Sequence, residues 1–443
     1  MDMLINFLEN NAMLTNAVVL IIAYIFIVIE RIPKVTVAIL GAGASLLLAL
    51  VATHSTGYNL GAYYGNFMGQ IFNVIFLLVS MMIVVNISAK SGMYTWVAKE
   101  IVKKTKGHPK YVFFALAFFT AFVSAFLDNV TTVILVMPIT YAVCKMLEIN
   151  PVCFLITEIL TSNIGGTATL IGDPPNIIIG AAADFSFMDF INELTLIVVI
   201  IFITTTFFLM FLFRKQLVAD KRKMAKVRKI DNSDTIKDKP LVIRSCIVLL
   251  LIIIGFVTHD MTHIPAFLIA MIGAAIMLIY EKPEEVFVHV EWDTIIFFIG
   301  LFLLIGGVEA SGAISLVADW LLKATQGSQA ITSMIMLWGS AGIAGIIGNI
   351  PYTTAMTPVV YSMQTHMTNG TEWIHPVWWS LSLGACLGGN LTIIGAAANV
   401  IVSGAAGKNG HKITFIDFLK YGASSTVIAM VVSSIYIWLR YLI

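Results

Sequence analysis

The sequence predicts an all-α membrane protein built from two inverted repeats, each with five membrane-spanning helices and one re-entrant hairpin. Three observations predict this fold. The 443 residues are 59% hydrophobic and 12% charged, with a mean hydropathy of +0.92, whereas a soluble domain carries about twice that share of charged residues. Apolar runs as long as an α-helix needs to cross the hydrocarbon core recur along the chain. The two halves of the chain also align with each other.

The alignment of the halves is carried by polar residues as well as apolar ones. A shift of 220 residues places 73–98 on 293–318 and 129–138 on 349–358. A shift of 223 residues places five residues of the first half on identical residues of the second, namely Gly165, Gly166, Thr169, Gly172 and Asn176 on Gly388, Gly389, Thr392, Gly395 and Asn399. Hydrophobicity alone does not produce such matches, so we infer an internal repeat. Because five spans is an odd number, the second copy is expected to lie inverted in the membrane.

A basic segment near the middle of the chain predicts the orientation. Residues 214–244 hold 11 of the 26 Lys and Arg residues, and short basic loops stay in the cytoplasm. The charges of the other loops then alternate between the two sides of the membrane only if segments 111–148 and 331–365 are hairpins. Each hairpin would enter and leave the membrane on the same side. This reasoning predicts ten spans, two hairpins and both termini outside, in a multi-pass protein of the plasma (inner) membrane. The expected layout is a first repeat over 1–213, a cytoplasmic linker over 214–241 and a second repeat over 242–443.

Two segments, 152–183 and 377–405, are predicted to be helices broken at membrane depth. The first contains SNIGGTATLIGDPPNIIIG, residues 162–180. Proline lacks the backbone N–H and clashes with a preceding helical turn, and glycine leaves helical geometry easily. We therefore expect the helix to stop near Asn163 and to resume after Asn176. Such a break persists only inside protein or along a water-filled cavity, because unsatisfied backbone groups are costly in lipid.

The broken helices and the hairpin tips together predict the binding sites. Freed carbonyls with amide, hydroxyl and carboxylate oxygens suit Na⁺, and the N-termini of half-helices suit an anion. The first site is expected to combine Asp128, Asn129, Thr131, Thr132, Asn163, Gly165, Gly166, Thr167, Thr169, Gly172, Asp173, Pro174 and Asn176. The second is expected to combine Asn349, Pro351, Thr353, Thr354, Gly388, Gly389, Asn390, Thr392, Gly395 and Asn399. The candidate Na⁺ ligands are Asn129, Asn163, Asp173 and Asn176.

Carboxylates occur only in the first of these sites. Asp128 aligns with Gly348, and Asp173 aligns with Ala396. An ionisable residue at membrane depth is a functional candidate by default, so both aspartates are candidates for binding a cation or a proton. The alternative is that either one caps the N-terminus of a half-helix, where Asp is favoured anyway. Glu158 lies one turn before the break and could be a third acid.

Several kinds of function find no support in the sequence. The net charge of +1 offers no basis for nucleic-acid binding, and the four cysteines and eight histidines form no ligand pattern. No nucleophile–base motif is visible, so an enzyme is not expected. No nucleotide-binding loop is visible either. We therefore expect no cofactor apart from Na⁺ or H⁺ as a coupling ion. A soluble ATPase partner is possible but is not indicated.

The motifs SNIGGTATLIGDPPN, FLDNVTTVILVMP and ACLGGNLTIIGAAANV resemble those of the ion transporter superfamily. They look closest to its arsenite-pump and sodium–proton-antiporter branch with citrate-transporter-like domains, near the melanosomal P protein. The resemblance covers about residues 20–440. It implies a scaffold that often dimerises, hence a homodimer, and a transport domain that moves like an elevator. It also implies that the Asn- and Thr-bearing tips bind substrate and coupling ions.

The resemblance leaves the cargo open. Dicarboxylate carriers of the superfamily carry Ser-Asn-Thr at both tips, whereas the tips here read DNVT and NIPYT. No arginine lies in either site to clamp a carboxylate. We therefore expect Na⁺- or H⁺-coupled transport of a small inorganic ion or oxyanion, such as arsenite. One alternative is a Na⁺/H⁺ antiporter with no other cargo, and another is an ion channel on the same scaffold. Transport direction and stoichiometry are not predicted.

Overall fold

The computed structural model describes residues 11–56, 60–227, 231–232, 234–367 and 370–443, and every regular element in these ranges is a helix. The predicted all-α class is confirmed. Eight helices of the described chain are long and apolar enough to cross a membrane. These eight include one arm of each predicted hairpin, because length and hydropathy do not separate a re-entrant arm from a span. The ten spans and the outside termini stay predictions, and residues 1–10 lie outside the described ranges.

The described residues of the first half form ten helices, with a short π-helical segment at Ile191–Thr195. They are α2 (Ala12–Ile29), α3 (Lys34–Thr56), α4 (Leu60–Lys90), α5 (Met93–Lys104), α6 (Pro109–Ser124), α7 (Asn129–Leu147), α8 (Val152–Gly166), α9 (Pro174–Ala183), α10 (Phe187–Phe190) and α11 (Leu196–Leu212). The predicted linker contains one further short helix, α12 (Lys221–Val227).

The second half forms a similar series. It comprises α13 (Lys239–Val257), α14 (His259–Thr262), α15 (Ala266–Leu278), α16 (Pro283–Phe287), α17 (Trp292–Ala310), α18 (Ala313–Ala324), α19 (Gln329–Ile347), α20 (Asn349–His366), α21 (Gly370–Gly388), α22 (Ala397–Lys408) and α23 (Phe415–Ile437). The predicted hairpins correspond to α6–α7 and α19–α20, with ends within two residues of the expected ones.

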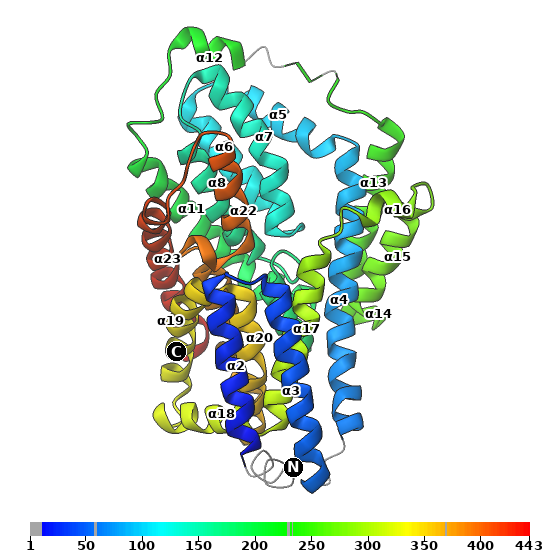
Figure 1. Cartoon of the computed structure of the whole chain (residues 1–443). Coiled ribbons are helices and arrows are strands. Elements are labelled where there is room, and N and C mark those ends of the chain that lie inside the picture. The colour runs from blue at the N-terminus through cyan, green and yellow to red at the C-terminus, as the bar shows by residue number, and fades with distance from the viewer. Residues whose placement is uncertain (1–10, 57–59, 228–230, 233, 368–369) are drawn as a thin grey trace.

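Six helices pack together as one bundle, here named the frame, consisting of α2, α3, α4, α13, α15 and α17. Within the frame, α3 lies along α17 and α4 lies along α15 (Figure 1). The first pair approaches closely because small residues face each other: a Cβ added at Gly307 would lie 2.0 Å from Oγ of Ser45. Ser45 donates to Oδ1 of Asn16 at 2.8 Å, which joins α2 to the same contact.

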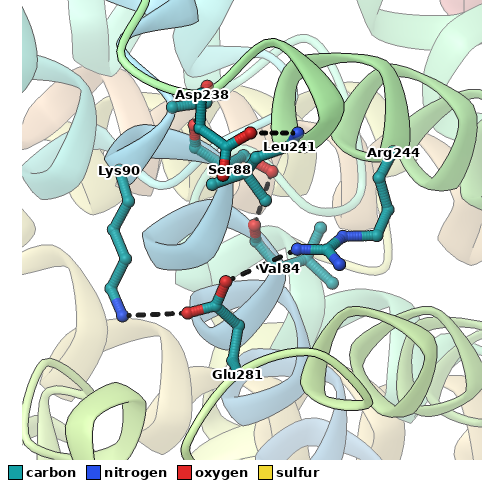
Figure 2. Close-up of polar contacts among 8 residues, drawn as sticks. Val84, Ser88, Lys90, Asp238, Leu241, Arg244 and Glu281 are labelled. Atoms are coloured by element: carbon teal, nitrogen blue, oxygen red, sulfur yellow. Dashed lines mark hydrogen bonds and ion pairs between the residues drawn. The ribbon is translucent and has the colours of Figure 1, made fainter.

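A charged cluster holds one end of the frame together. Figure 2 shows Glu281 between Lys90 at the end of α4 and Arg244 on α13, with N–O distances of 3.3 and 3.4 Å. The Arg244 guanidinium also lies 4.5 Å above the ring of Tyr280. Asp238 caps α13 by accepting from the backbone N–H of Leu241 at 3.0 Å. One carboxylate thus links the end of α4, the start of α13 and the turn after α15.

The other long helices surround the two helix breaks and are here named the site helices, consisting of α6 to α9, α11 and α19 to α23. In this group α6 packs on α8, and α19 packs on α21. A Cβ at Gly165 of α8 would lie 2.0 Å from the carbonyl oxygen of Ala121 of α6. Glycine is therefore required there for the two backbones to approach, and the first break is held directly against the first hairpin.

Two amphipathic helices, α5 and α18, lie at opposite ends of the molecule (Figure 1). Each follows a glycine in the left-handed region, Gly92 with φ +80° and Gly312 with φ +82°. The linker, with α12, lies at the same end as α5 (Figure 1). It contacts α5 directly, because Lys99 donates to Oγ1 of Thr235 at 2.8 Å.

The C-terminal end of the chain is joined to the predicted outer loop. Arg440 pairs with Glu193, with 2.7 Å between Nε and Oε2, and Tyr441 also donates to this carboxylate. A basic residue near the C-terminus would favour a cytoplasmic end. Here its charge is matched by an acidic partner on the segment before α11.

Candidate functional site

The first helix break lies close to its predicted position, but the prolines have a different role from the one expected. Helix α8 continues to Gly166, past Asn163, and α9 begins at Pro174, before Asn176. Pro174 and Pro175 occupy the first two positions of α9. The N–H groups at these positions have no partner within the helix, and the fixed φ of proline suits a helix start. The prolines therefore begin the second half-helix, and the glycine-rich stretch before them forms the break.

Side chains and glycines of the first break hold it in shape. Asn176 donates through Nδ2 to the carbonyl oxygens of Thr167 and Thr169, at 3.1 and 2.9 Å. The Thr169 hydroxyl donates to the carbonyl oxygen of Ala125, next to the first hairpin tip. A Cβ at Gly172 would lie 2.6 Å from the carbonyl oxygen of Gly166. The break is thus a compact loop whose freed carbonyls are largely satisfied by protein groups.

The second break repeats most of these contacts at aligned positions. Helix α21 ends at Gly388, a 3₁₀ turn spans Ile393–Gly395, and α22 begins at Ala397. Asn399 donates to the carbonyl oxygens of Gly389 and Thr392 at 2.7 and 2.8 Å. The Thr392 hydroxyl donates to the carbonyl oxygen of Gly345 at 2.5 Å, next to the second tip. The matched Asn and Thr residues therefore perform the same structural task in both halves.

Asp173 lies at the centre of the site. It is fully buried and precedes α9, yet its side chain caps no backbone N–H of that helix. Instead, Asn349 of α20 donates through Nδ2 to both carboxylate oxygens, at 3.3 and 3.4 Å. Nδ2 of Asn129 lies 3.5 Å from Oδ1 of the same carboxylate. The tips of both hairpins therefore reach one buried carboxylate.

Asn163 of α8 connects the two halves a second time. Its Oδ1 accepts from Asn129 at 2.9 Å, and its Nδ2 donates to Oδ1 of Asn390 at 2.8 Å and of Asn399 at 3.0 Å. The two sites expected from the sequence therefore form one polar network. We name it the central cluster, consisting of Asn129, Asn163, Asp173, Asn349, Asn390 and Asn399, all of which are buried.

Asp128 has the role that the alternative interpretation predicted. Its Oδ1 accepts from the backbone N–H of Thr131 at 2.8 Å, so its side chain caps α7. The carboxylate is only half-buried. The two aspartates of the first half therefore differ, since one caps a helix and the other is held by amides from both hairpins.

The remaining predicted residues mostly support the helices that carry the cluster. The hydroxyls of Thr167 and Thr353 donate to the carbonyl oxygens of Asn163 and Asn349, both at 2.8 Å. Thr354 donates back to Ile350 in the same way. Thr132 is buried without a hydrogen-bond partner for its hydroxyl. The bonded hydroxyls support the helices that orient the cluster, and the Thr132 hydroxyl remains available to a ligand.

Three contributors to the site were missed in the sequence. Ser382 and Cys386 of α21 donate to Oδ1 of Asn176 at 2.6 and 3.4 Å. Cys386 aligns with Asn163 at the shift of 223 residues, so the repeat held a signal for it, but Ser382 aligns with an isoleucine. Tyr24 of α2 donates to the carbonyl oxygen of Pro351 at 2.6 Å. This contact between the frame and the second tip has no local sequence signal.

The geometry is that of a polar site built between two helix breaks and two hairpin tips, and comparison with known proteins shows where it belongs. The model of the family described as "Citrate transporter" matches residues 24–384. The chain belongs to this family. An uncharacterized transporter of Mycobacterium tuberculosis is 38% identical over 427 residues, covering 96% of this chain and 98% of the relative. This member of the citrate transporter family is therefore a multi-pass membrane transporter and not an enzyme.

More distant relatives confirm the resemblance inferred from the sequence. The human P protein is 27% identical over 500 residues, which covers 95% of this chain but 59% of the P protein. Among solved structures, the YdaH transporter of Alcanivorax borkumensis shares the fold with a TM-score of 0.56. It is 13% identical in sequence, and the match covers 85% of this chain and 87% of that chain. At this identity the match concerns the fold alone.

Proposed function

We propose that this chain is a secondary active transporter that couples Na⁺ or H⁺ to the movement of a small inorganic ion or oxyanion. The observation that carries the proposal is the fully buried carboxylate of Asp173, to which amides from both hairpin tips point. An isolated buried carboxylate is strongly disfavoured unless a cation, a proton or hydrogen bonds compensate it. Amide donors supply only part of this compensation, so a cation or proton is the expected companion.

The first break favours a cation. Its segments 124–132 and 160–176 contain no Lys, Arg or His and include two aspartates. Because Pro174 and Pro175 fill the first two positions of α9, the start of this half-helix lacks two of the N–H groups that would otherwise bind an anion. Amide, carbonyl and carboxylate oxygens suit a hard cation. We assign Asp173, Asn129, Asn163 and Asn176 as candidate ligands.

The second break favours an anion. Ala396 stands before α22 where Asp173 stands before α9, and the first residues of α22 are alanines that keep their N–H groups. Among the described residues, no side chain caps α22. Uncapped helix N-termini attract anions through free N–H groups and the helix dipole. The two breaks thus differ in the charge they favour, which is the arrangement that cotransport of a cation with an anion requires.

An elevator mechanism on an inverted repeat accounts for the division into frame and site helices. The recurrence of the same Asn and Thr contacts in both breaks supports the repeat. Helices α5 and α18 connect α4 and α17 of the frame to the hairpin helices α6 and α19. In this proposal they are the arms along which the site helices move, and the frame forms the interface of a homodimer.

The proposed cargo follows from the basic and thiol side chains that the site lacks. Segments 347–354 and 386–399 contain no Lys, Arg or His, so a bidentate clamp for the carboxylates of citrate is absent. Cys386 is the only cysteine in these segments, so arsenite would bind through hydroxyl and amide contacts rather than thiolates. The same absence of basic side chains favours the second candidate, a Na⁺/H⁺ antiporter with no other cargo.

Thermal unfolding of the purified protein tests the proposal. Melting is recorded at fixed pH in Na⁺, K⁺ or choline, and arsenite, phosphate, citrate or chloride is then added. A ligand at roughly 100 times its dissociation constant stabilises the folded state by about 2.7 kcal/mol. We expect a cation-specific rise in Tm that is lost in Asp173→Asn, followed by a further rise with one anion. A cation effect without any anion effect would favour the antiporter.

The matched control is Asp319→Asn on α18, a half-exposed aspartate outside the central cluster. It should keep the full cation response. A cation response that survives in Asp173→Asn would remove the basis of the proposed site. Counterflow in liposomes separates a carrier from a channel, because only a carrier exchanges labelled substrate against its gradient.

A further inference from the structure

A second buried acid, Glu158, lies on α8 outside the central cluster. Its side chain is 2% exposed. It precedes Asn163 by five residues on the same helix, which is roughly 7 Å along the axis at the usual rise per residue. Neither the cation site nor the anion site proposed above uses it. An acid at this depth needs its own explanation because burial of an ionised carboxylate is costly.

The Glu158 carboxyl has one hydrogen-bond partner in the described part of the chain. The hydroxyl of Thr140 on α7 donates to its Oε1. Among the described residues, no Lys, Arg or His nitrogen lies within salt-bridge distance of it. An unpaired buried carboxyl is far more stable as the neutral acid. Bound H⁺ is thus the cation that this environment can accept.

Thr140 differs from four buried threonines of the site helices. Thr120, Thr157, Thr161 and Thr353 each donate to the backbone carbonyl four residues earlier, at about the same 2.8 Å. Thr140 points its hydroxyl across to α8 instead. This contact joins the first hairpin to the broken helix, and it places a group that can both donate and accept beside the acid.

The titratable groups that face Glu158 are weak acids. Tyr141 and Cys144 come from α7, and Cys153 comes from α8 itself. Of the other helices packed on α8, α11 and residues 112–124 of α6 contain no ionisable side chain. On the remaining packed helices, Cys386 of α21 contacts Asn176, Tyr421 of α23 contacts Phe213, and Tyr436 of α23 donates to the Glu193 carbonyl. The other titratable residues of these helices are exposed, namely Glu372, His375, Lys408, Asp417 and Lys420.

A route for protons toward the surface runs along α7. The Tyr141 hydroxyl, next to Thr140 in sequence, is buried and lies beside the side chain of Asn409. The Tyr141 ring stacks on His411, with 6.0 Å between ring centroids, and His411 is half-exposed in the loop after α22. Hydroxyl and imidazole groups accept and donate protons. Tyr141 follows the hydrogen-bond partner of the buried acid in sequence, and its ring contacts a half-exposed histidine.

We propose that Glu158 is a proton-binding site separate from the central cluster, which takes up and releases H⁺ through Tyr141 and His411. Uptake converts the carboxylate to the acid by adding one H⁺ to an oxygen, and release reverses this without any other bond change. The inference rests on the proposed function, because it names H⁺ as an ion that this transporter carries. It adds a second site to the one at Asp173.

Infrared spectroscopy of the full chain in liposomes tests this proposal without knowledge of the cargo. A protonated carboxyl shows a C=O stretching band that disappears on ionisation. We expect one such band to vary with pH in the wild type and to be missing in Glu158→Gln, which keeps the shape of the neutral acid. The control Glu284→Gln, at an exposed position on α16, should keep the band. The proposal would be overturned if Glu158→Gln had the same set of pH-dependent carboxyl bands as the wild type, or if no carboxyl band of the wild type changed with pH.

Two further variants retain the acid, so the test does not depend on the folding of one protein. Thr140→Val removes the hydrogen bond and should shift the frequency of the band, and an unchanged frequency would contradict the assignment. Transfer into D₂O shifts the same band as the acid proton exchanges. Tyr141→Phe should slow this exchange several-fold, and an unchanged rate would exclude the route through Tyr141.

The outcome is distinguishable from failure of the proposed function. The loss of the cation response in Asp173→Asn reports on Asp173, and the part of the infrared band that is lost in Glu158→Gln reports on Glu158. If the band is lost in Glu158→Gln but the wild type shows no cation response, the result supports the proton site and contradicts the cation site. If the wild type shows a cation response but the band is unchanged in Glu158→Gln, the result supports the cation site and contradicts the proton site.

Discussion

Asn349 of α20 donates its side-chain amide to both oxygens of Asp173, at 3.3 and 3.4 Å, although the two residues are 176 positions apart. The carboxylate comes from the first half of the chain, and its closest amide donor comes from the second. Occupancy of the proposed cation site therefore depends on the second hairpin tip as well as on the first break.

The first prediction follows from this contact. Asn349→Ala should weaken cation binding although it removes no charge, because hydrogen bonds to charged groups contribute about 1.5–3 kcal/mol. A loss in this range corresponds to roughly ten-fold or more in affinity, measured by cation titration of Tm. Asn409→Ala, at an exposed asparagine outside the central cluster that donates to the Ala405 carbonyl at its own helix end, is the control. Equal affinities in the two variants would contradict the assignment.

The second prediction concerns the close approach of α8 to α6. Gly165→Ala should be severely destabilising, because the added Cβ would lie 2.0 Å from the Ala121 carbonyl oxygen. Gly342→Ala on α19 is a matched substitution where nothing lies within 4 Å, and it should be neutral or stabilising by up to about 1 kcal/mol. Thermal unfolding of both variants measures the difference. Similar Tm values would show that the two helices can separate without cost.

A third prediction tests movement between frame and site helices. If the second tip slides past α2 during transport, the bond from Tyr24 to the Pro351 carbonyl must break in each cycle. Tyr24→Phe removes this bond, worth about 1 kcal/mol, and should change the rate of sodium counterflow several-fold. The fold should be unaffected because the ring is retained. A rate equal to that of the wild type would indicate that this contact persists throughout the cycle.

The fourth prediction concerns the C-terminal end. Glu193→Gln should lower stability by about 1–2 kcal/mol, since the carboxylate pairs with Arg440 and accepts from Tyr441. Added salt should reduce the difference from the wild type. The exposed pair Lys282–Glu285, whose side chains are 78% and 60% exposed, serves for comparison, and Lys282→Ala should have no measurable effect. Equal effects of the two substitutions would show that the partial burial of Glu193 does not strengthen its contacts.

Much of the fold and of the candidate site could be predicted from the types of neighbouring residues in the sequence. Composition and apolar run length indicated helices in a membrane. The Gly-rich stretches with adjacent Asn and Thr located the first break to within three residues and the second within segment 377–405. The matched residues Asn176 and Asn399 predicted contacts that recur in both halves. These features were accessible because they depend on neighbours in sequence or on residue identity at a fixed offset.

Only the tertiary structure decided how the pieces meet. The sequence offered two sites and two equivalent aspartates, whereas packing produced one central cluster, left Asp128 as a cap and aimed both hairpin tips at Asp173. The contacts Ser382–Asn176, Tyr24–Pro351 and Asn163–Asn390 each join residues more than 200 positions apart. Side chains that meet across such separations do so because helices pack in three dimensions, and periodicity along one helix contains no information about its partner.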